Sequence, residues 1–142
     1  MKELTLCIIK PDAVSRSETW SILRDIEEVG IQVVQIKKYF FSEEAAIDFY
    51  SEHCGKHFFP GLVEFMSSGP CYVAVLSADN VVERYRRLMG NTDPVMAESG
   101  TLRGDYGTAC PRNAVHGSDS IESAQREIDW FGFEYEGLLY GW

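Results

Sequence analysis

A continuous apolar run at residues 71–76 constrains the fold more than any other segment of this 142-residue chain. The run has the length of one strand and shows no alternation of polar and apolar positions. This pattern is typical of a strand that lies inside a sheet and is covered on both faces. The sequence therefore predicts a sheet in which residues 71–76 form a central strand.

Segments of strand type and helix type alternate along the rest of the chain. Residues 4–9 and 31–41 are rich in apolar and β-branched side chains and predict strands, and residues 113–115 form a very short strand candidate. Apolar positions recur at helical spacing in residues 13–29, after Ser42, in residues 62–66, after Asp79 and after Asp119 or Ser120. This order fits an α+β fold of the ferredoxin-like, split βαβ type, with a four-stranded antiparallel sheet and helices on one face.

A long segment without periodicity, residues 91–112, interrupts this pattern. It contains three glycines and two prolines. A loop of this length inside a compact domain is usually either functional or disordered. Thr92, Thr101 and Arg103 would suit a loop that contacts phosphate, but composition alone leaves both interpretations open.

Length and composition predict a single domain over residues 1–142. With 45% hydrophobic residues the chain can fill one core, which we expect in residues 1–131. The aromatic tail, residues 132–142, is expected to pack on the surface or on another subunit. Neither a signal peptide nor an apolar run of membrane-spanning length is visible, so we expect a soluble, cytoplasmic protein without a membrane partner.

The charge balance restricts the ligands. The chain carries 13 cations against 22 anions, and its net charge of -9 argues against a nucleic-acid partner, which would need a broad basic face. A small phosphorylated ligand remains possible if a few cations converge. The four cysteines (Cys7, Cys54, Cys71 and Cys110) are scattered without metal-ligand spacing and are expected to be reduced thiols.

One histidine stands out among the chemically active side chains. His116 follows the short apolar run 113–115 and precedes Gly117, Ser118 and the predicted start of the last helix. By itself this pattern has two readings. His116 is either a nucleophile or a strand-end residue that is hydrogen-bonded to a helix start.

Five separated motifs bear on this choice. They are KPDAV at residues 10–14, FMSSGP at 65–70, RRLMGNTDP at 86–94, GTLR at 100–103 and NAVHGSDS at 113–120. In this order and spacing they resemble the nucleoside diphosphate kinase family, from about residue 3 to residue 131. The resemblance implies a phosphotransferase that moves the γ-phosphoryl group of a nucleoside triphosphate to a nucleoside diphosphate by a ping-pong mechanism.

The resemblance also implies roles for individual residues. His116 would carry the phosphoryl group, Glu127 would orient the imidazole, and Ser118 would support it. The phosphate ligands would be Lys10, which also counts as catalytic, with Tyr50, Arg86, Thr92, Arg103 and Asn113. The nucleobase would stack on Phe58, beside Leu62 and Cys110.

Cofactor and partners follow from the same resemblance. Mg²⁺ would be held mainly by the nucleotide phosphates, without a direct protein ligand, and the partners would be nucleoside di- and triphosphates. The family also implies a homo-oligomer, either a tetramer or a hexamer. Departures at Trp20 and Ser99 leave the choice of assembly open.

Two other functions compete with this prediction. A catalytically inactive nucleotide-binding protein is disfavoured because His116, Glu127, Lys10 and both predicted arginines are intact. A protein-histidine phosphotransferase that uses His116 is not excluded by the sequence. His53 and His57 are expected to take no part in the chemistry.

Overall fold

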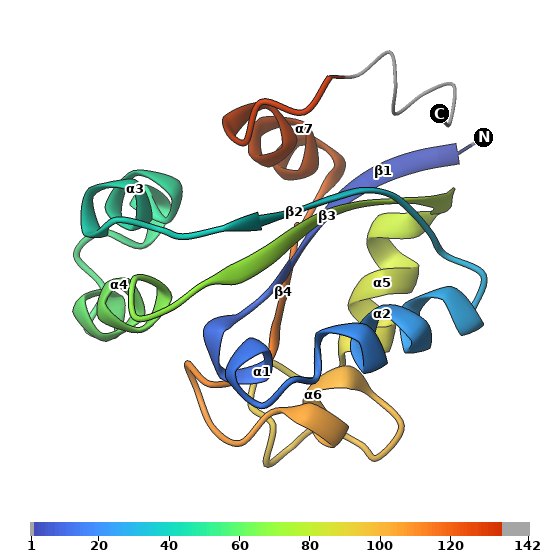
Figure 1. Ribbon diagram of the computed structural model, residues 1–142, viewed down its shortest axis with the longest axis horizontal. Coiled ribbons are helices and arrows are strands. Elements are labelled where there is room, and N and C mark those ends of the chain that lie inside the picture. Colours follow the sequence, from blue (N-terminus) through green and yellow to red (C-terminus); the bar gives the residue numbers. More distant parts are fainter. Residues whose placement is uncertain (1, 135–142) are drawn as a thin grey trace.

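The computed structural model describes residues 2–134, which form a four-stranded antiparallel sheet with helices (Figure 1). The strand order is β2-β3-β1-β4. This confirms the predicted α+β fold, and β3 is indeed an inner strand. Residues 135–142, most of the predicted tail, lie outside the described residues. The strands are β1 (Lys2–Ile9), β2 (Gln32–Tyr39), β3 (Cys71–Asp79) and β4 (Val115–Gly117).

Serine or threonine side chains cap three of the helices in residues 2–134, those that begin at Glu43, Leu102 and Ile121. Ser42 and Ser120 each accept a hydrogen bond from a backbone N–H three residues later, at 3.0 Å. The cap predicted at Asp79 is one residue too early, because the helix that begins at Val81 has Asn80 at its N-cap position, without a side-chain cap within the described residues. The helices are α1 (Pro11–Ser15), α2 (Thr19–Glu28), α3 (Glu43–Phe49), the 3₁₀-helix η1 (Ser51–His53), α4 (Phe59–Met66), α5 (Val81–Met89), α6 (Leu102–Tyr106) and α7 (Ile121–Trp130).

Two segments differ from the sequence prediction. The single helix expected at residues 13–29 is divided into α1 and α2, because Ser17 adopts a left-handed backbone with φ of 62°. The predicted loop 91–112 contains the short helix α6, which Thr101 caps by accepting from the Gly104 N–H at 3.1 Å.

Helices cover both faces of the sheet, so the prediction of helices on one face is wrong (Figure 1). On β1, Cys7 and Ile9 pack with α2 and α5, whereas Leu6 and Ile8 pack with α3, α4 and α7. Successive side chains of a strand point to opposite faces, and here both sets are apolar. The unbroken apolar run of β3 has the same cause.

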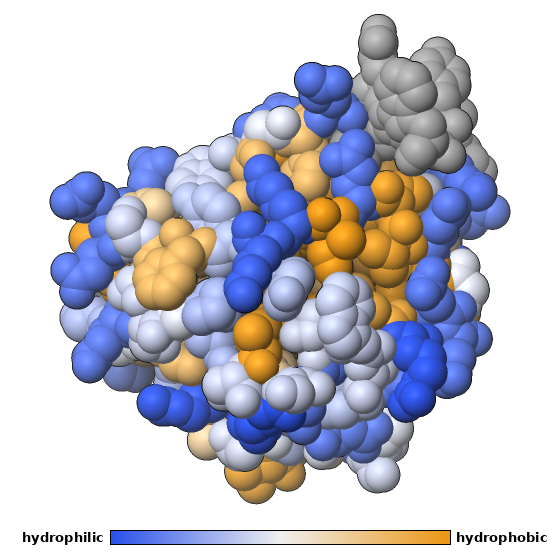
Figure 2. Space-filling view, in the orientation of Figure 1, coloured by the Kyte–Doolittle hydropathy of each residue, from blue (hydrophilic) through white to orange (hydrophobic). Residues whose placement is uncertain are grey.

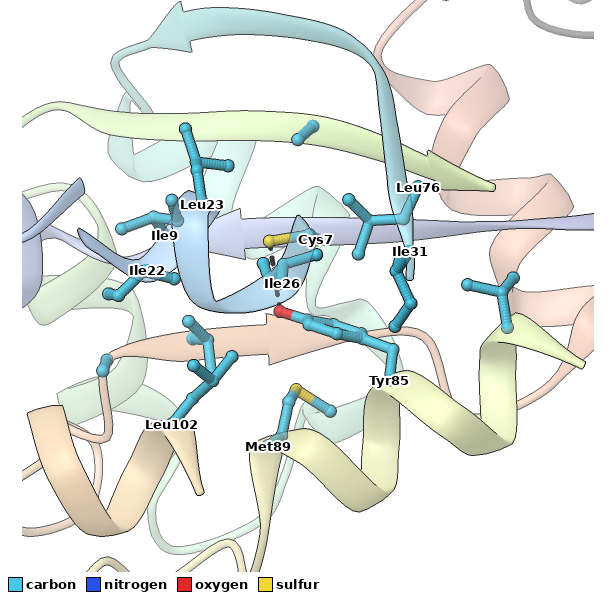
Figure 3. Packing of buried hydrophobic residues seen from close by; sticks show 14 of the residues in the cluster. Cys7, Ile9, Ile22, Leu23, Ile26, Ile31, Leu76, Tyr85, Met89 and Leu102 are labelled. Atoms are coloured by element: carbon cyan, nitrogen blue, oxygen red, sulfur yellow. Dashed lines mark hydrogen bonds between the residues drawn. The ribbon is translucent and has the colours of Figure 1, made fainter. Parts of the chain in front are cut away.

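The α5 side of the sheet holds β4 in place (Figure 3). The Tyr85 hydroxyl oxygen lies 3.1 Å from the Cys7 Sγ and 3.3 Å from the carbonyl oxygen of His116. A Cβ at Gly117 would lie 2.5 Å from the Met89 Cε, so glycine allows β4 to pack this closely on α5. This packing fixes the strand that carries His116.

Strand pairing brings the segment that follows β1 beside the segment that precedes β4. β1 runs antiparallel to β4, with Ile8 opposite His116 and Ile9 opposite Val115. The end of β1 therefore meets the beginning of β4, and Lys10 lies beside Ala114, where its N–H donates to the Ala114 carbonyl at 2.8 Å. None of the helices in residues 2–134 combines the length and apolar character of a membrane span.

Candidate active site

A cavity of about 610 Å³ opens where β1, β4, the α3–α4 segment and the loop before β4 meet. Nine of the residues that the sequence assigned to a nucleotide site line it. The nine are Lys10, Tyr50, Phe58, Leu62, Thr92, Arg103, Cys110, Asn113 and His116. A space of this size accommodates a small ligand.

His116 and Glu127 form the central pair of the site. The His116 Nε2 lies 2.8 Å from the Glu127 Oε1, and the Ser118 hydroxyl donates to the same oxygen at 2.9 Å. The side chain of His116 is 18% exposed and that of Glu127 is 8% exposed. Because an ionised carboxylate only accepts hydrogen bonds, this contact favours a proton on Nε2, and in a neutral ring the lone pair is then on Nδ1.

Local structure explains why these groups meet. Ser120 caps α7, and Glu127 lies on the buried face of that helix with Ala124 and Ile128. Ser118, between β4 and α7, is fully buried and accepts from the Leu6 N–H at 3.2 Å. The glutamate is thereby fixed against β1 and β4 before any ligand binds.

Lys10 and Asn113 form a second linked group. The Lys10 Nζ donates to the Asn113 Oδ1 at 2.7 Å, and the Asn113 Nδ2 donates to the Thr92 carbonyl at 2.9 Å. The pKa of Lys10 is lowered to about 8, mainly by burial and also by the charge of the Arg103 guanidinium, while Asp12 opposes the shift. An anion in the cavity would therefore meet a pre-positioned ammonium that is poorly solvated.

Arg103 comes from α6, the helix that the sequence did not predict. Its Nη1 donates to the Gly90 carbonyl at 3.2 Å and its Nη2 to the Val115 carbonyl at 3.1 Å. Its Nε is buried and has no partner within residues 2–134. Burial lowers the pKa of Arg103 below its usual range. The guanidinium is thus held by two hydrogen bonds, and its Nε–H is still available to donate to a ligand.

Tyr50 also has an unused hydrogen-bonding group. Its side chain is 5% exposed, and its hydroxyl has no partner within the described residues. Burial raises the pKa of Tyr50 well above its ordinary value, so the hydroxyl stays a donor. A buried polar group without a partner is costly, and an anionic ligand in the cavity would satisfy it.

The outer part of the cavity is apolar and aromatic. Phe58 is 43% exposed, and its ring also contacts the rings of His53 and His57. The sequence reasoning missed His53, His57, Gly61 and Pro111, which also line the cavity. Their closeness to Phe58 or Cys110 in the sequence was the available signal, but periodicity could not separate core from cavity positions.

Arg86 is the predicted phosphate ligand that lies outside this cavity. It is exposed on α5 and borders a separate pocket of about 410 Å³ together with Asp119. A hydrogen bond from Ser123 lowers the pKa of Asp119, and the charge of Arg86 contributes in the same direction. The role of Arg86 toward phosphate therefore stays a prediction.

Comparisons with known proteins agree with this geometry. The sequence model of the nucleoside diphosphate kinase family matches residues 3–136. An orthorhombic crystal form of the Aquifex aeolicus nucleoside diphosphate kinase is 40% identical, with a TM-score of 0.92 over 96% of this chain and 99% of that one. A halophilic nucleoside diphosphate kinase from Halobacterium salinarum, solved in complex with CDP, is 38% identical, with a TM-score of 0.90 over 96% of this chain and 91% of that one. The chain belongs to the nucleoside diphosphate kinase family and is a nucleotide phosphotransferase.

Proposed function

We propose that this enzyme transfers the γ-phosphoryl group of a nucleoside triphosphate to a nucleoside diphosphate by a ping-pong mechanism, through a phosphohistidine on His116. The pairing of Nε2 with Glu127 at 2.8 Å carries the proposal, because it leaves Nδ1 as the nucleophilic nitrogen of a cavity-lining ring. The CDP complex of the Halobacterium relative supports nucleotides as substrates of this chain.

In the first half-reaction, the Nδ1 lone pair forms a bond to the γ-phosphorus, and the bond from that phosphorus to the β-phosphate oxygen breaks. The nucleoside diphosphate leaves with the bonding electrons. The ring gains positive charge, which the Glu127 carboxylate stabilises through Nε2, and no proton has to move. The second half-reaction is the reverse, with another nucleoside diphosphate as acceptor.

Charge compensation on the phosphate oxygens supplies most of the remaining catalysis in reactions of this type. Lys10 and Arg103 offer cationic donors, and the Asn113 amide, the Thr92 hydroxyl and the Tyr50 hydroxyl are further groups at the cavity wall. Lys10 and Arg103 are held in place by hydrogen bonds, so little reorganisation is needed when a nucleotide binds.

Mg²⁺ fits this site as a companion of the nucleotide. The residues that line the cavity in the described part of the chain include cations and amides but no carboxylate. Such a lining suits an ion whose oxygen ligands come mainly from phosphates and water. When bound, Mg²⁺ would supply further neutralisation of the phosphate charge.

We also propose that the nucleobase stacks on Phe58, with Leu62 and Cys110 nearby. Every base presents a π-face, so stacking without hydrogen bonds to the base edge would tolerate all nucleobases. The exposed ring of Phe58 at the outer part of the cavity supports this proposal.

We propose further that the chain is one domain and forms a tetramer or hexamer in the cytoplasm. The family match over residues 3–136 supports one domain. Exposed apolar side chains, among them those of Ile36 and Phe40, support an assembly. Figure 2 shows a patch of hydrophobic residues on the face of the molecule that Figure 1 presents. The four free cysteines suit a reducing compartment. Light scattering after size exclusion should give four or six times the 16.1 kDa of the chain.

Labelling tests the phosphohistidine directly. The protein is incubated with γ-labelled ATP and Mg²⁺, and GDP is then added. We expect acid-labile label on His116 that GDP discharges as GTP. His116→Ala should bind ADP but remain unlabelled. Absence of label on the wild type would disprove the proposal, and label that GDP cannot remove would instead indicate a protein acceptor.

A further inference from the structure

The residue two positions before His116 has an unusual backbone. Ala114 is fully buried and has φ of 71°, a left-handed conformation that residues other than glycine rarely adopt. The Val115 N–H donates to the Asn113 carbonyl at 2.8 Å, so Ala114 is the centre of a tight γ-turn. A strained conformation of this kind persists only where the surroundings enforce it.

The segment after β1 supplies that enforcement. The Lys10 N–H donates to the Ala114 carbonyl at 2.8 Å, and the Ala114 N–H donates to the Asp12 Oδ2 at 3.0 Å, across 102 positions of the chain. Both polar backbone groups of Ala114 are thereby held by residues 10–12. The side chain of Asp12 is 2% exposed, so solvent does not compete for this bond.

The γ-turn joins the two functional parts of the cavity. On one side lies Asn113, whose side chain contacts Lys10 and Thr92. On the other side β4 begins and carries His116 toward Glu127. The conformation of Ala114 therefore sets the position of the nucleophile relative to the Lys10–Asn113 group.

We infer that Asp12 is a positioning residue, whose carboxylate holds Ala114 in the left-handed conformation and so aligns His116 with the Lys10–Asn113 group. This inference rests on the proposed function, in which His116 is the nucleophile. Asp12 lines no part of the cavity wall, so it acts through Ala114 and not through contact with the nucleotide.

A second role for Asp12 has to be separated from this one. Its negative charge opposes the lowering of the Lys10 pKa and thus favours the ammonium form. Asp12→Asn distinguishes the two roles, because an amide oxygen can still accept from the Ala114 N–H but carries no charge. Ala114→Gly distinguishes them as well, since glycine adopts positive φ without strain and needs no clamp.

The experiment measures single-turnover phosphorylation of His116 at saturating labelled ATP, together with the Kd for ADP and the melting temperature. We expect Asp12→Ala to slow phosphorylation by about tenfold or more, and Asp12→Asn to slow it by less than about threefold. Asp12→Ala combined with Ala114→Gly should recover most of the rate. The matched control combines Asp12→Ala with Asn80→Gly, which relieves positive φ at a remote site, and should recover none.

The outcomes separate cleanly. If Asp12→Asn is as slow as Asp12→Ala and Ala114→Gly restores nothing, the charge matters and the positioning role is wrong. If Asn80→Gly restores the rate as well, the effect is general stabilisation and the inference is again wrong. Should Asp12→Ala not fold, Asp12→Ser, whose side chain is too short to reach Ala114, replaces it. Failure of the proposed function is seen independently, as an unlabelled wild type.

Discussion

In the proposed mechanism the tautomer of His116 is set by the carboxylate of Glu127, which lies eleven positions later in the chain and 2.8 Å from Nε2. Glutamine at position 127 could donate to Nε2 through its amide, which would favour the tautomer with hydrogen on Nδ1 and remove the nucleophilic lone pair. The shape of the site would hardly change. In the proposed mechanism the site therefore needs a carboxylate at this position, because a glutamine amide could act toward Nε2 as either donor or acceptor.

Glu127→Gln should lower the single-turnover rate of His116 phosphorylation by about 10²-fold, while the Kd for ADP stays within about twofold. Rapid-quench labelling and calorimetry measure the two quantities. Glu122→Gln is the matched control, since Glu122 is exposed on the first turn of the same helix. An equal loss of ADP affinity would show that Glu127 acts on binding.

Lys10 should make nucleotide binding sensitive to pH. With its pKa lowered to about 8, Lys10 is cationic below that pH and becomes neutral above it. ADP affinity should therefore decrease as the pH rises through 8, by up to about tenfold between pH 7 and pH 9. Calorimetric titrations at several pH values measure this slope.

The control for this slope is Lys10→Met, which should bind more weakly at pH 7 and lose the dependence. Other ionisable groups line the same cavity, among them His53, His57 and Cys110. The contribution of Lys10 is therefore the difference between the wild-type and variant slopes. Identical slopes would assign the dependence to the other groups.

The sequence predicted which residues line the cavity better than it predicted how their side chains are placed. Nine of the expected nucleotide-site residues lie together because some adjoin the ends of strands, some belong to the loop before β4, and Tyr50, Phe58 and Leu62 come from the α3–α4 segment. Arg86 and Arg103 look equivalent in sequence, yet Arg103 is held between two carbonyls and Arg86 lies outside the cavity. The two arginines differ only in where the folded backbone places them, and local sequence patterns do not predict that placement.

Among the elements, β4 and α5 pack so closely at Gly117 that a substitution there tests the fold. Gly117→Ala would place a Cβ 2.5 Å from the Met89 Cε and 2.7 Å from the Tyr85 Cε2. We expect this overpacking to lower the free energy of unfolding by about 1–3 kcal/mol, measured by denaturant titration.

Gly61→Ala is the matched control for that change. Gly61 lies in α4, and a Cβ there meets nothing within 4 Å among residues 2–134. Because alanine favours helix, this variant should be more stable by up to about 1 kcal/mol. A similar loss in both variants would mean that the contact between β4 and α5 is not specific.

Periodicity predicted those elements whose burial is regular. The central strand and the helices capped by Ser42 and Ser120 follow from patterns of apolar residues and caps. Helix α6 has only five residues and contains Gly104, so no repeat could reveal it. The sequence predicts that both faces of residues 71–76 are covered, but the apolar spacing within a helix does not tell which face of the sheet that helix covers.

In the molecule as a whole, the reactivity of the four thiols tests whether both faces of the sheet are covered and whether the cavity is open. Cys7 is buried on one face of the sheet and Cys71 on the other, and burial raises the pKa of each thiol to about 12. Cys54 and Cys110 are exposed, and Cys110 lines the cavity.

A thiol reagent at neutral pH should therefore modify Cys54 and Cys110 in the native protein, and all four cysteines only after unfolding. ADP should slow the reaction of Cys110 but not that of Cys54. Mass spectrometry of peptides from a time course identifies each site. Rapid modification of Cys7 or Cys71 without denaturant would contradict the conclusion that helices cover both faces of the sheet.

The strand order also determines when the sheet and the proposed site can assemble during translation. β1 leaves the ribosome first, but its two neighbours in the sheet, β3 and β4, are made from residues 71–79 and 115–117. Lys10 must then wait for Asn113, and His116 for Glu127. A nascent chain can therefore hold the helices from α1 to α6 and still lack the proposed catalytic pair until residue 127 has left the ribosome.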